Sequence, residues 1–386
     1  MKQLPIPEIA ALFQLDPEVA FLNHGSFGAC PRPVFESYQH WQRELEREPV
    51  LFLGRRINGL LEEARTTLGD YVGASAQDLV FVPNATYGVN VVARSLELGP
   101  EDEVLGSDHE YGAVDRTWRF LASQRGFQYT RQHVALPLET PEQILEQFWA
   151  GVTERTRVIC ISHITSPTAL IFPIAEICRR ARAAGILTII DGAHAPGQLD
   201  LDMQAIGADF YTGNCHKWLC APKGSGFLYA RPDKQHLLKP LVVSWGYESM
   251  TPSGSVFQDL FGWTGTHDPA AYLSVPAAIA FQKQHGWHDI RLACHQLVAQ
   301  AREHVAALTG LPQVYPDDQK LWVQMCILPI PAQTRVSVQD FWNYDQVEIP
   351  VTFWGEQQFV RISVQGYTQP EHIERLVKAV KGIFSL

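Results

Sequence analysis

The first residue that could do chemistry is a lysine in an unusual setting. Lys217 lies in "TGNCHKWLCAPKGSGFLY" (212–229), between a histidine and a tryptophan and upstream of a glycine-rich run that leads into an apolar strand. Most lysines are surface residues, but His216, Trp218 and Leu219 give this one an aromatic and apolar setting rather than a solvated one. This setting indicates that the amine has a chemical role. Such a role requires further functional groups close to the lysine.

A carboxylate and a phosphate site are predicted to accompany this lysine. Ligands of open parallel sheets bind beyond the carboxyl ends of the strands, and the strand "ILTII" ends at Asp191. The strand "LVFV" ends at Pro83, and Asn84, Ala85 and Thr86 then begin a helix. Free N–H groups at a helix start, with a threonine hydroxyl beside them, can bind phosphate, whereas Asn84 alone would indicate only an N-cap.

Pyridoxal phosphate requires these three features together. The cofactor needs a lysine for its Schiff base, an acid that keeps the pyridine nitrogen protonated, and a pocket for its phosphate. Lys217, Asp191 and the helix start at residues 84–86 meet these requirements. The sequence therefore predicts a pyridoxal-phosphate enzyme.

The elements that must position these residues follow an α/β pattern. "TRVICISHI" (156–164) has the β-branched density of a buried strand, "PIAEICRRARAAG" (173–185) has apolar residues at helical spacing, and "ILTIIDGA" (186–193) is again a strand. Gly185 lies where a helix C-cap is expected. A short crossover helix between two buried strands implies parallel pairing.

Composition argues against several other classes of protein. The formal net charge is -10 and no run of Lys or Arg stands out, so nucleic acid is not an expected partner. The amino terminus does not resemble a secretory signal and no segment is long enough to span a bilayer, so we expect a cytoplasmic protein without membrane contact. The 7 cysteines include no C-x-x-C pair, which argues against disulfides and a zinc site, and no metal is expected. The loops after the identified strands lack the G-x-G-x-x-G of a nicotinamide enzyme.

Five motifs, in this order, resemble those of class V pyridoxal-phosphate enzymes of the aspartate-aminotransferase fold, and within them the isopenicillin N epimerase-like branch. They are "PNATYGVN" (83–90), "DHEYGA" (108–113), "DGAHAPG" (191–197), "HKW" with "PKGSGFLY" (216–229) and "WTGTHD" (263–268). The resemblance runs from "FLNHGSFGACP" at residue 21 to "VRISVQGYTQPEHIERL" near the end. It implies an α/β protein of the pyridoxal-phosphate transferase fold type I.

That fold has a large, mainly parallel-sheet domain and a smaller C-terminal α+β domain. We expect an N-terminal arm over residues 1–20, the large cofactor-binding domain over 21–255 and the smaller domain over 256–386. "GWHDIRLACHQLVAQAREHVAALTG" predicts a long helix that opens the smaller domain, and "VRISVQGY" predicts a strand of its sheet.

The resemblance also implies cofactor contacts, residue by residue. Lys217 matches the Schiff-base lysine and, once a substrate amine displaces it, the base for the Cα proton. Asp191 matches the partner of the pyridine nitrogen. His194 matches the position that supports the phenolic oxygen, where relatives often have Gln. The implied phosphate contacts are Asn84, Ala85, Thr86 and His216.

Other cofactor contacts are altered relative to the family or remain open. Tyr111 falls where relatives stack an aromatic ring, often histidine, on the cofactor. His109 is the alternative, but the spacing to Trp118 favours Tyr111. Ser166 or Thr168 occupies the region where relatives hold the phenolic oxygen with Asn.

Further matches concern the substrate and the assembly. Arg361 in "FVRIS" matches the arginine that binds the α-carboxylate of an amino-acid substrate, for which a two-pronged donor is well suited. Asn23 and His24 match an N-terminal segment that folds over the active site. Thr266 matches the residue that reaches the phosphate in the neighbouring subunit, which implies a homodimer with composite active sites.

The reaction is less constrained than the cofactor. Epimerisation, β-elimination, transamination and sulfur abstraction all begin at the same Cα centre. A desulfurase needs a nucleophilic cysteine on a mobile C-terminal loop, but Cys326 lies in the apolar run "LWVQMCILPIP", where a buried, inert thiol is expected. We expect epimerase- or racemase-type chemistry, with a carbon–sulfur lyase or desulfurase-like enzyme as the alternative. A non-catalytic protein of this fold is the alternative of another class.

Overall fold

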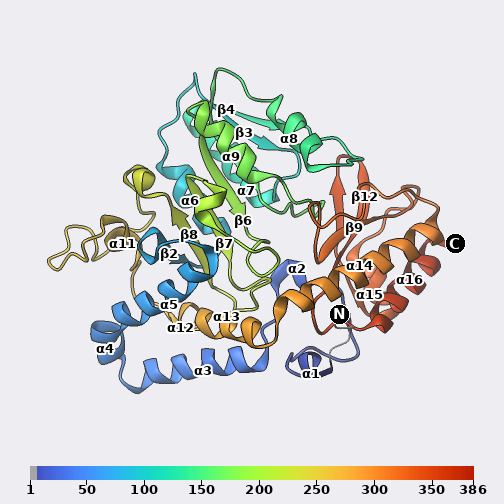
Figure 1. Ribbon diagram of the computed structural model, residues 1–386, viewed down its shortest axis with the longest axis horizontal. Helices are drawn as coiled ribbons and strands as arrows, with labels where there is room; N and C mark the ends of the chain where they lie inside the picture. Colours follow the sequence, from blue (N-terminus) through green and yellow to red (C-terminus); the bar gives the residue numbers. More distant parts are fainter. Residues whose placement is uncertain (1–6) are drawn as a thin grey trace.

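A seven-stranded sheet forms the centre of the computed structural model, which describes residues 7–386 (Figure 1). Its strand order is β2-β8-β7-β6-β5-β3-β4. The strands are β2 (Leu79–Val82), β3 (Glu103–Ser107), β4 (Gln128–Gln132), β5 (Thr156–Ser162), β6 (Leu187–Gly192), β7 (Phe210–Asn214) and β8 (Gly226–Ala230). Strands β3 to β7 pair in parallel, and β8 runs antiparallel to both of its neighbours. This confirms the predicted α/β fold class.

Both faces of the sheet are buried, which explains the continuous apolar runs of its strands. In β5, Val158 and Cys160 belong to one hydrophobic cluster, whereas Ile159 and Ile161 belong to another. Side chains alternate between the two faces of a strand, so each cluster covers one face. The helices that connect the strands are α6 (Ala85–Ser95), α7 (Gly112–Arg125), α8 (Pro141–Trp149), α9 (Ile174–Ala183) and α10 (Met203–Ile206).

The predicted crossover unit is confirmed in detail. Helix α9 connects β5 to β6 along the chain, and its predicted apolar positions are buried. The two strands pair in parallel. Ala184 is the C-cap of the helix. Gly185 follows it with a φ of 71°, the left-handed conformation that ends many helices and that glycine adopts without strain.

A second layer of helices lies beside the sheet, at the lower left of Figure 1. Helices α3 (Arg32–Arg47) and α5 (Ile57–Val72) come from the first part of the chain, whereas α11 (Val256–Phe261), α12 (Ala270–Leu273) and α13 (Val275–Gln284) follow β8. Helices α12 and α13 pack against α3 and α5, and α11 packs against β2.

The C-terminal part has its own sheet, shown at the right of Figure 1. Strands β9 (Met325–Pro329), β11 (Val351–Trp354) and β12 (Gln357–Ser363) form an antiparallel sheet with the order β11-β12-β9. Helices α14 (Trp287–Thr309), α15 (Val338–Asp345) and α16 (Pro370–Phe384) accompany it. The predicted long helix and the predicted strand around Arg361 are thus confirmed, while the domain boundary at 255/256 stays a prediction.

The N-terminal segment joins the two parts of the molecule. After α1 (Pro7–Ala10), strand β1 (Ala20–Phe21) pairs in parallel with β10 (Val347–Glu348), and Asn23 forms a bridge with Ser363. The short helix α2 (His24–Phe27) follows immediately. Within residues 7–386, no helix combines the length and the hydrophobicity needed to cross a bilayer.

Candidate active site

Three of the predicted site residues lie at the carboxyl edge of the large sheet. Asp191 lies at the end of β6, and Lys217 lies in the loop that follows β7. Asn84 caps the helix that follows β2. Because β2, β6 and β7 run in the same direction, their carboxyl ends share one edge.

The amine of Lys217 is enclosed, as the sequence predicts. Burial and, to a smaller extent, the positive charge of Arg361 together lower the pKa of Lys217 to about 8, while Asp191 acts in the opposite direction. An amine with this pKa is partly uncharged near neutral pH and can serve as a nucleophile or as a base.

His194 and Trp218 form a hydrogen-bonded chain with this amine. The Nε2 atom of His194 lies 3.3 Å from Lys217 Nζ, and the Nδ1 atom of the same ring accepts a hydrogen bond of 3.2 Å from Trp218 Nε1. Burial and the charges of Lys217 and Arg361 hold the pKa of His194 well below its ordinary value, so the ring is neutral. The residue predicted to support the phenolic oxygen therefore also contacts the reactive lysine.

The carboxylate of Asp191 lies on the face of the large sheet that α6 and α7 cover. Side chains alternate between the two faces of β6, so Asp191 shares a face with Ile189 and not with Ile190. Ile189 packs against apolar residues of α6 and α7. Its Oδ1 atom accepts a hydrogen bond of 2.9 Å from Ala193 N–H. Burial raises the pKa of Asp191, while this hydrogen bond and Lys217 act against the rise. A cation bound opposite Asp191 would favour its ionised form in the same way.

The start of α6 has free donors where a phosphate was predicted. Asn84 caps the helix by accepting Tyr87 N–H at 2.9 Å, and Asn214 accepts Ala85 N–H at 2.8 Å. Within the described chain, the hydrogen bonds leave the N–H and hydroxyl groups of Thr86 without a partner at this positive helix end.

His216 is oriented by the chain that follows the lysine. Its Nδ1 atom donates to the carbonyl oxygen of Ser225 at 2.8 Å, which leaves Nε2 for another contact. Burial lowers the pKa of His216 to about 4. The predicted contacts of His216, Thr86 and Ala85 with phosphate stay predictions.

His24 holds the backbone of Lys217 through a hydrogen bond. Its Nε2 atom donates to the carbonyl oxygen of Lys217 at 3.1 Å, and its Nδ1 atom accepts from the hydroxyl of Tyr367 at 3.0 Å. Gly28 lies so close to this loop that a Cβ atom there would come within 2.1 Å of the carbonyl oxygen of His216. Since both ring nitrogens of His24 are engaged, the structure assigns it a supporting position, and its contact with substrate stays a prediction.

Arg361 of β12 is buried and is held by hydrogen bonds from two sides. Its Nη1 atom donates to the backbone oxygen of Ser166 at 2.6 Å and to the hydroxyl of the same residue at 3.0 Å. Its Nη2 atom donates to Ser26 Oγ at 3.4 Å, and Ser26 donates to Asn23 Oδ1 at 2.5 Å. The Nε atom of Arg361 is buried without a partner in the described chain, which suits a ligand that carries a carboxylate.

Ser166 and Thr168 differ in what their hydroxyls contact. Ser166 faces Arg361, whereas Thr168 lies 2.7 Å from His109 Nδ1 and 2.8 Å from Thr165 Oγ1. The Nε2 atom of His109 donates to the backbone of Val134 at 2.7 Å, so both ring nitrogens of this buried histidine are occupied. The role of the two hydroxyls in binding a phenolic oxygen stays a prediction.

Tyr111 is the open aromatic residue beside these groups. Its side chain is 44% exposed, and it is close enough to Arg361 to raise the pKa of the guanidinium against the larger, opposite effect of burial. The choice of Tyr111 over His109 as the ring that stacks on a cofactor stays a prediction. Thr266, in the loop before α12, is exposed, and its contact with a second subunit stays a prediction.

Two residues of this edge were not predicted from the sequence. Asn214 ends β7 and fixes the start of α6 through Ala85, and the rule that strand ends face the ligand could have found it. Glu110 is buried and accepts hydrogen bonds from Ser107 at 2.6 Å and from Ser162 at 2.8 Å. Burial raises the pKa of Glu110 to about 7. No local sequence pattern predicts this second buried acid.

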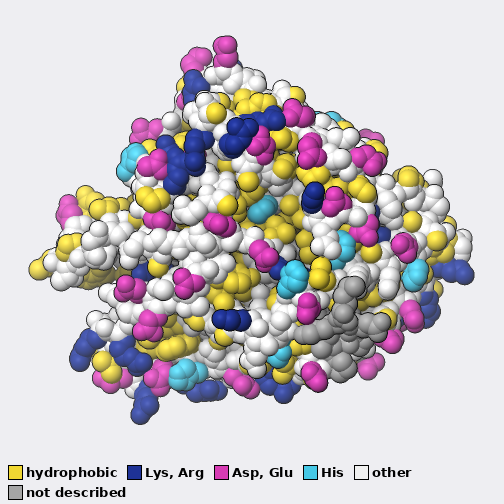
Figure 2. Space-filling model, viewed as in Figure 1, with side chains coloured by type: hydrophobic (Ala, Val, Ile, Leu, Met, Phe, Trp, Pro, Cys, Tyr) yellow, Lys and Arg dark blue, Asp and Glu magenta, His cyan; other side chains and the backbone are white. Residues whose placement is uncertain are grey.

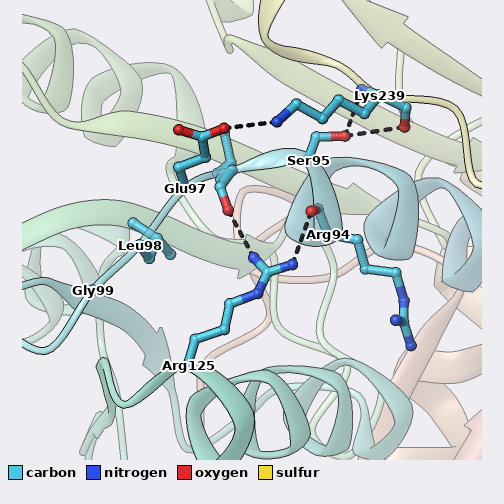
Figure 3. A pocket seen from close by; sticks show the side chains of 8 residues that line it. Arg94, Ser95, Glu97, Leu98, Gly99, Arg125 and Lys239 are labelled. Atoms are coloured by element: carbon cyan, nitrogen blue, oxygen red, sulfur yellow. Dashed lines mark hydrogen bonds and ion pairs between the residues drawn. The ribbon is translucent and has the colours of Figure 1, made fainter.

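A separate pocket lies at the C-terminal end of α6 and is lined by none of the predicted site residues (Figure 3). Its basic side chains are already engaged. Arg125 donates to the backbone oxygens of Leu96 and Arg94, and Lys239 pairs with Glu97 at 2.7 Å. The third basic residue of the lining, Arg94, donates through Nε to Asn90 Oδ1 at 3.4 Å.

Comparison with known proteins agrees with the fold and identifies a family. The chain matches the family "Aminotransferase class-V" over residues 30–376. It is 37% identical to isopenicillin N epimerase of Streptomyces clavuligerus, with 96% of each chain covered. It is 28% identical to a probable chloroplastic L-cysteine desulfhydrase of Arabidopsis thaliana, which covers 95% of this chain and 83% of the relative. An apo cysteine desulfurase from Thermococcus onnurineus superposes with a TM-score of 0.83 at 18% identity, with 100% and 99% of the two chains covered.

These matches and the site define a pyridoxal-phosphate-dependent enzyme of fold type I. The chain belongs to the class-V aminotransferase family, which uses pyridoxal phosphate. The residues present fit this cofactor, because a buried amine, a buried carboxylate and the N–H group of Thr86 at the start of α6, unpartnered among the described residues, lie at one sheet edge.

Proposed function

We propose that this protein is a pyridoxal-phosphate enzyme that acts at the Cα atom of an amino acid, with epimerase-type chemistry. The observation that carries the proposal is the buried Lys217 amine, which lies at the carboxyl edge of the large sheet together with Asp191 and is close enough to Arg361 of β12 for that charge to lower its pKa. The relatives named isopenicillin N epimerase, at 37% and 36% identity over nearly the full length, support this reaction type.

The cofactor, when bound, withdraws electrons from the substrate Cα and so makes its proton acidic. Lys217 would hold the cofactor covalently, Asp191 would keep its ring nitrogen protonated, and the start of α6 with His216 would hold its phosphate. Arg361 would bind the substrate carboxylate with its unpartnered Nε atom and so aim Cα at the lysine. The amine of Lys217, once free, is the base that takes the Cα proton.

Carbon–sulfur lyase activity is the second candidate. Relatives named L-cysteine desulfhydrase or L-cysteine desulfhydrase-like protein, at 27 to 31% identity, favour it. Elimination would use the same lysine and the same arginine, because it begins with loss of the same proton. A desulfurase is less well supported, since Cys326 is buried in β9 and burial raises the pKa of its thiol to about 12.

A homodimer in the cytoplasm is part of the proposal. The chain segment before and around α11 exposes large apolar side chains, with Trp245 84% and Met250 99% accessible. Figure 2 shows hydrophobic side chains at the tip of the projection on the left, where this segment lies in Figure 1. Exposed apolar side chains at such a projection support burial against a second copy, with Thr266 on the same stretch of chain.

Isotope exchange tests the proposed reaction. The enzyme is incubated in deuterated water with simple L-amino acids, L-cysteine, L-cystine and S-substituted cysteines, and solvent deuterium at Cα, chirality, pyruvate and sulfide are followed. We expect deuterium at Cα with loss of chirality and without pyruvate. Formation of pyruvate and ammonia would select the lyase instead. If cofactor-saturated enzyme gave neither deuterium at Cα nor pyruvate, the result would contradict catalysis at Cα.

A further inference from the structure

The hydrogen bonds around His194 determine which of its nitrogens carries the proton. The indole N–H of Trp218 can only donate, so His194 Nδ1 must accept at their distance of 3.2 Å. A neutral imidazole has one proton, which then resides on Nε2. That atom lies 3.3 Å from Lys217 Nζ, so the histidine presents a donor to the amine.

The indole cannot easily turn away from this histidine. Trp218 is fully buried, and its ring lies 4.9 Å from that of His24 between ring centroids. A Cβ atom at Gly197 would come within 2.2 Å of the Trp218 carbonyl oxygen, and that oxygen also accepts Gln282 Nε2 at 2.8 Å. Both the backbone and the ring of Trp218 are therefore fixed by packing.

We propose that Trp218 is a positioning residue that locks His194 in its Nε2–H tautomer, so that His194 donates a hydrogen bond to Lys217 and stabilises the uncharged form of that amine. A neutral amine nitrogen accepts such a bond through its lone pair, whereas an ammonium group has no lone pair and would meet the N–H group head-on. The inference rests on the proposed function only for the use of this amine as a base, because the chain of bonds is present in the protein alone.

The other groups that face the pair act on its charge in known directions. Arg361 disfavours protonation of both Lys217 and His194, His24 does the same to His194, and Asp191 favours a charged lysine. The tautomer lock differs from these charges because it depends on one neutral donor. Replacing that donor changes the hydrogen bond without changing any charge.

The tautomer can be measured directly in the full-length protein freed of cofactor. Magic-angle-spinning NMR of protein labelled with 13C and 15N only at histidine distinguishes the two tautomers, and a His194→Gln variant identifies the signal of His194 among the 14 histidines. We expect a neutral Nε2–H ring. An Nδ1–H or doubly protonated ring in the wild-type protein would overturn the inference, and this result needs no Trp218 variant to fold.

The consequence for the lysine is tested with Trp218→Phe. The pH dependence of reductive methylation at Lys217, read by peptide mapping, should shift upward by about one pH unit, the equivalent of one lost hydrogen bond. Trp322→Phe is the matched control, because Trp322 is also fully buried and donates its indole N–H, to Pro316, away from the site. An unshifted Lys217 profile in a folded Trp218→Phe protein would overturn the inference.

A double variant separates this role from general packing. In His194→Gln the amide can donate to Lys217 whatever Trp218 does, so adding Trp218→Phe should leave the methylation profile within about 0.3 pH units of the single variant. An equal shift in both backgrounds would show that Trp218 acts by packing and would contradict the lock. Loss of turnover on every amino acid, together with an Nε2–H ring, would instead contradict the proposed function and leave the tautomer assignment standing.

Discussion

The hydroxyl of Ser166 accepts a hydrogen bond of 3.0 Å from Nη1 of Arg361, which joins the loop after β5 to the strand β12 of the C-terminal sheet. The same guanidinium is bonded to Ser26 of the N-terminal segment. Three parts of the chain that are distant in sequence thus fix the orientation of one arginine. The side of the guanidinium that remains, at Nε, is the side available to a carboxylate.

Replacing Ser166 by alanine should therefore weaken substrate binding and spare the cofactor. We expect KM for the amino acid to rise by about 10-fold or more, the effect of one hydrogen bond to a charged group, with kcat changed less. Steady-state kinetics and the cofactor absorption spectrum check this, with the exposed Ser123→Ala as control. Loss of cofactor with unchanged KM would instead assign Ser166 to the phenolic oxygen, as the family position suggests.

Asp191→Asn should keep the fold and some cofactor but lose nearly all turnover. Asparagine is close to isosteric with aspartate, yet a neutral amide does not hold a ring nitrogen in its protonated form. We expect kcat to fall by roughly 100-fold or more, as for the loss of other buried electrostatic groups. Turnover at the wild-type rate, with an intact cofactor spectrum, would contradict the assigned role.

Glu110→Gln should change how stability depends on pH. The folded protein raises the pKa of Glu110 from 4.5 to about 7 through burial, so folding favours the protonated acid. The wild-type protein then loses stability relative to the variant as pH rises from about 4.5 to about 7, by at most roughly 3 kcal/mol. Urea unfolding of both proteins at pH 5 and pH 8 checks this. A difference in free energy of unfolding that is the same at both pH values would show that Glu110 titrates normally.

Local sequence patterns were sufficient for the residues that lie at strand ends or in short motifs. Asp191 and Asn84 follow directly from apolar runs and from helix-start chemistry, and the structure has β6, β2 and α6 where those patterns place them. Lys217 stood out because its neighbours are apolar and aromatic. In each case the signal lies within a few residues of the functional side chain.

Contacts between distant segments could not be predicted in this way. Glu110 depends on Ser162, 52 residues away, and Arg361 depends on Ser26, 335 residues away. The bond between Trp218 and His194 joins two motifs that were each recognised, but nothing in either motif states that the indole reaches the imidazole. Such pairs are set by how the sheet brings loops together, and a single sequence carries no record of that proximity.

Cys326→Ala is the variant that bears most directly on the choice of reaction. Cys326 is fully buried in β9, opposite Ile362 of β12, and burial raises the pKa of its thiol to about 12. A thiol in this state is a poor nucleophile, so removing it should leave deuterium exchange and any pyruvate formation within about 2-fold of the wild type. The cost should fall on stability instead, at about 1 kcal/mol for a small buried group. Cys294→Ala, at another buried cysteine, serves as the matched control for that cost.

A desulfurase would behave differently, because its cysteine must take sulfur from the substrate and hold it as a persulfide. Persulfide that forms in the wild type and in Cys294→Ala, but disappears in Cys326→Ala, would therefore require β9 to open during turnover and would assign the protein to sulfur transfer.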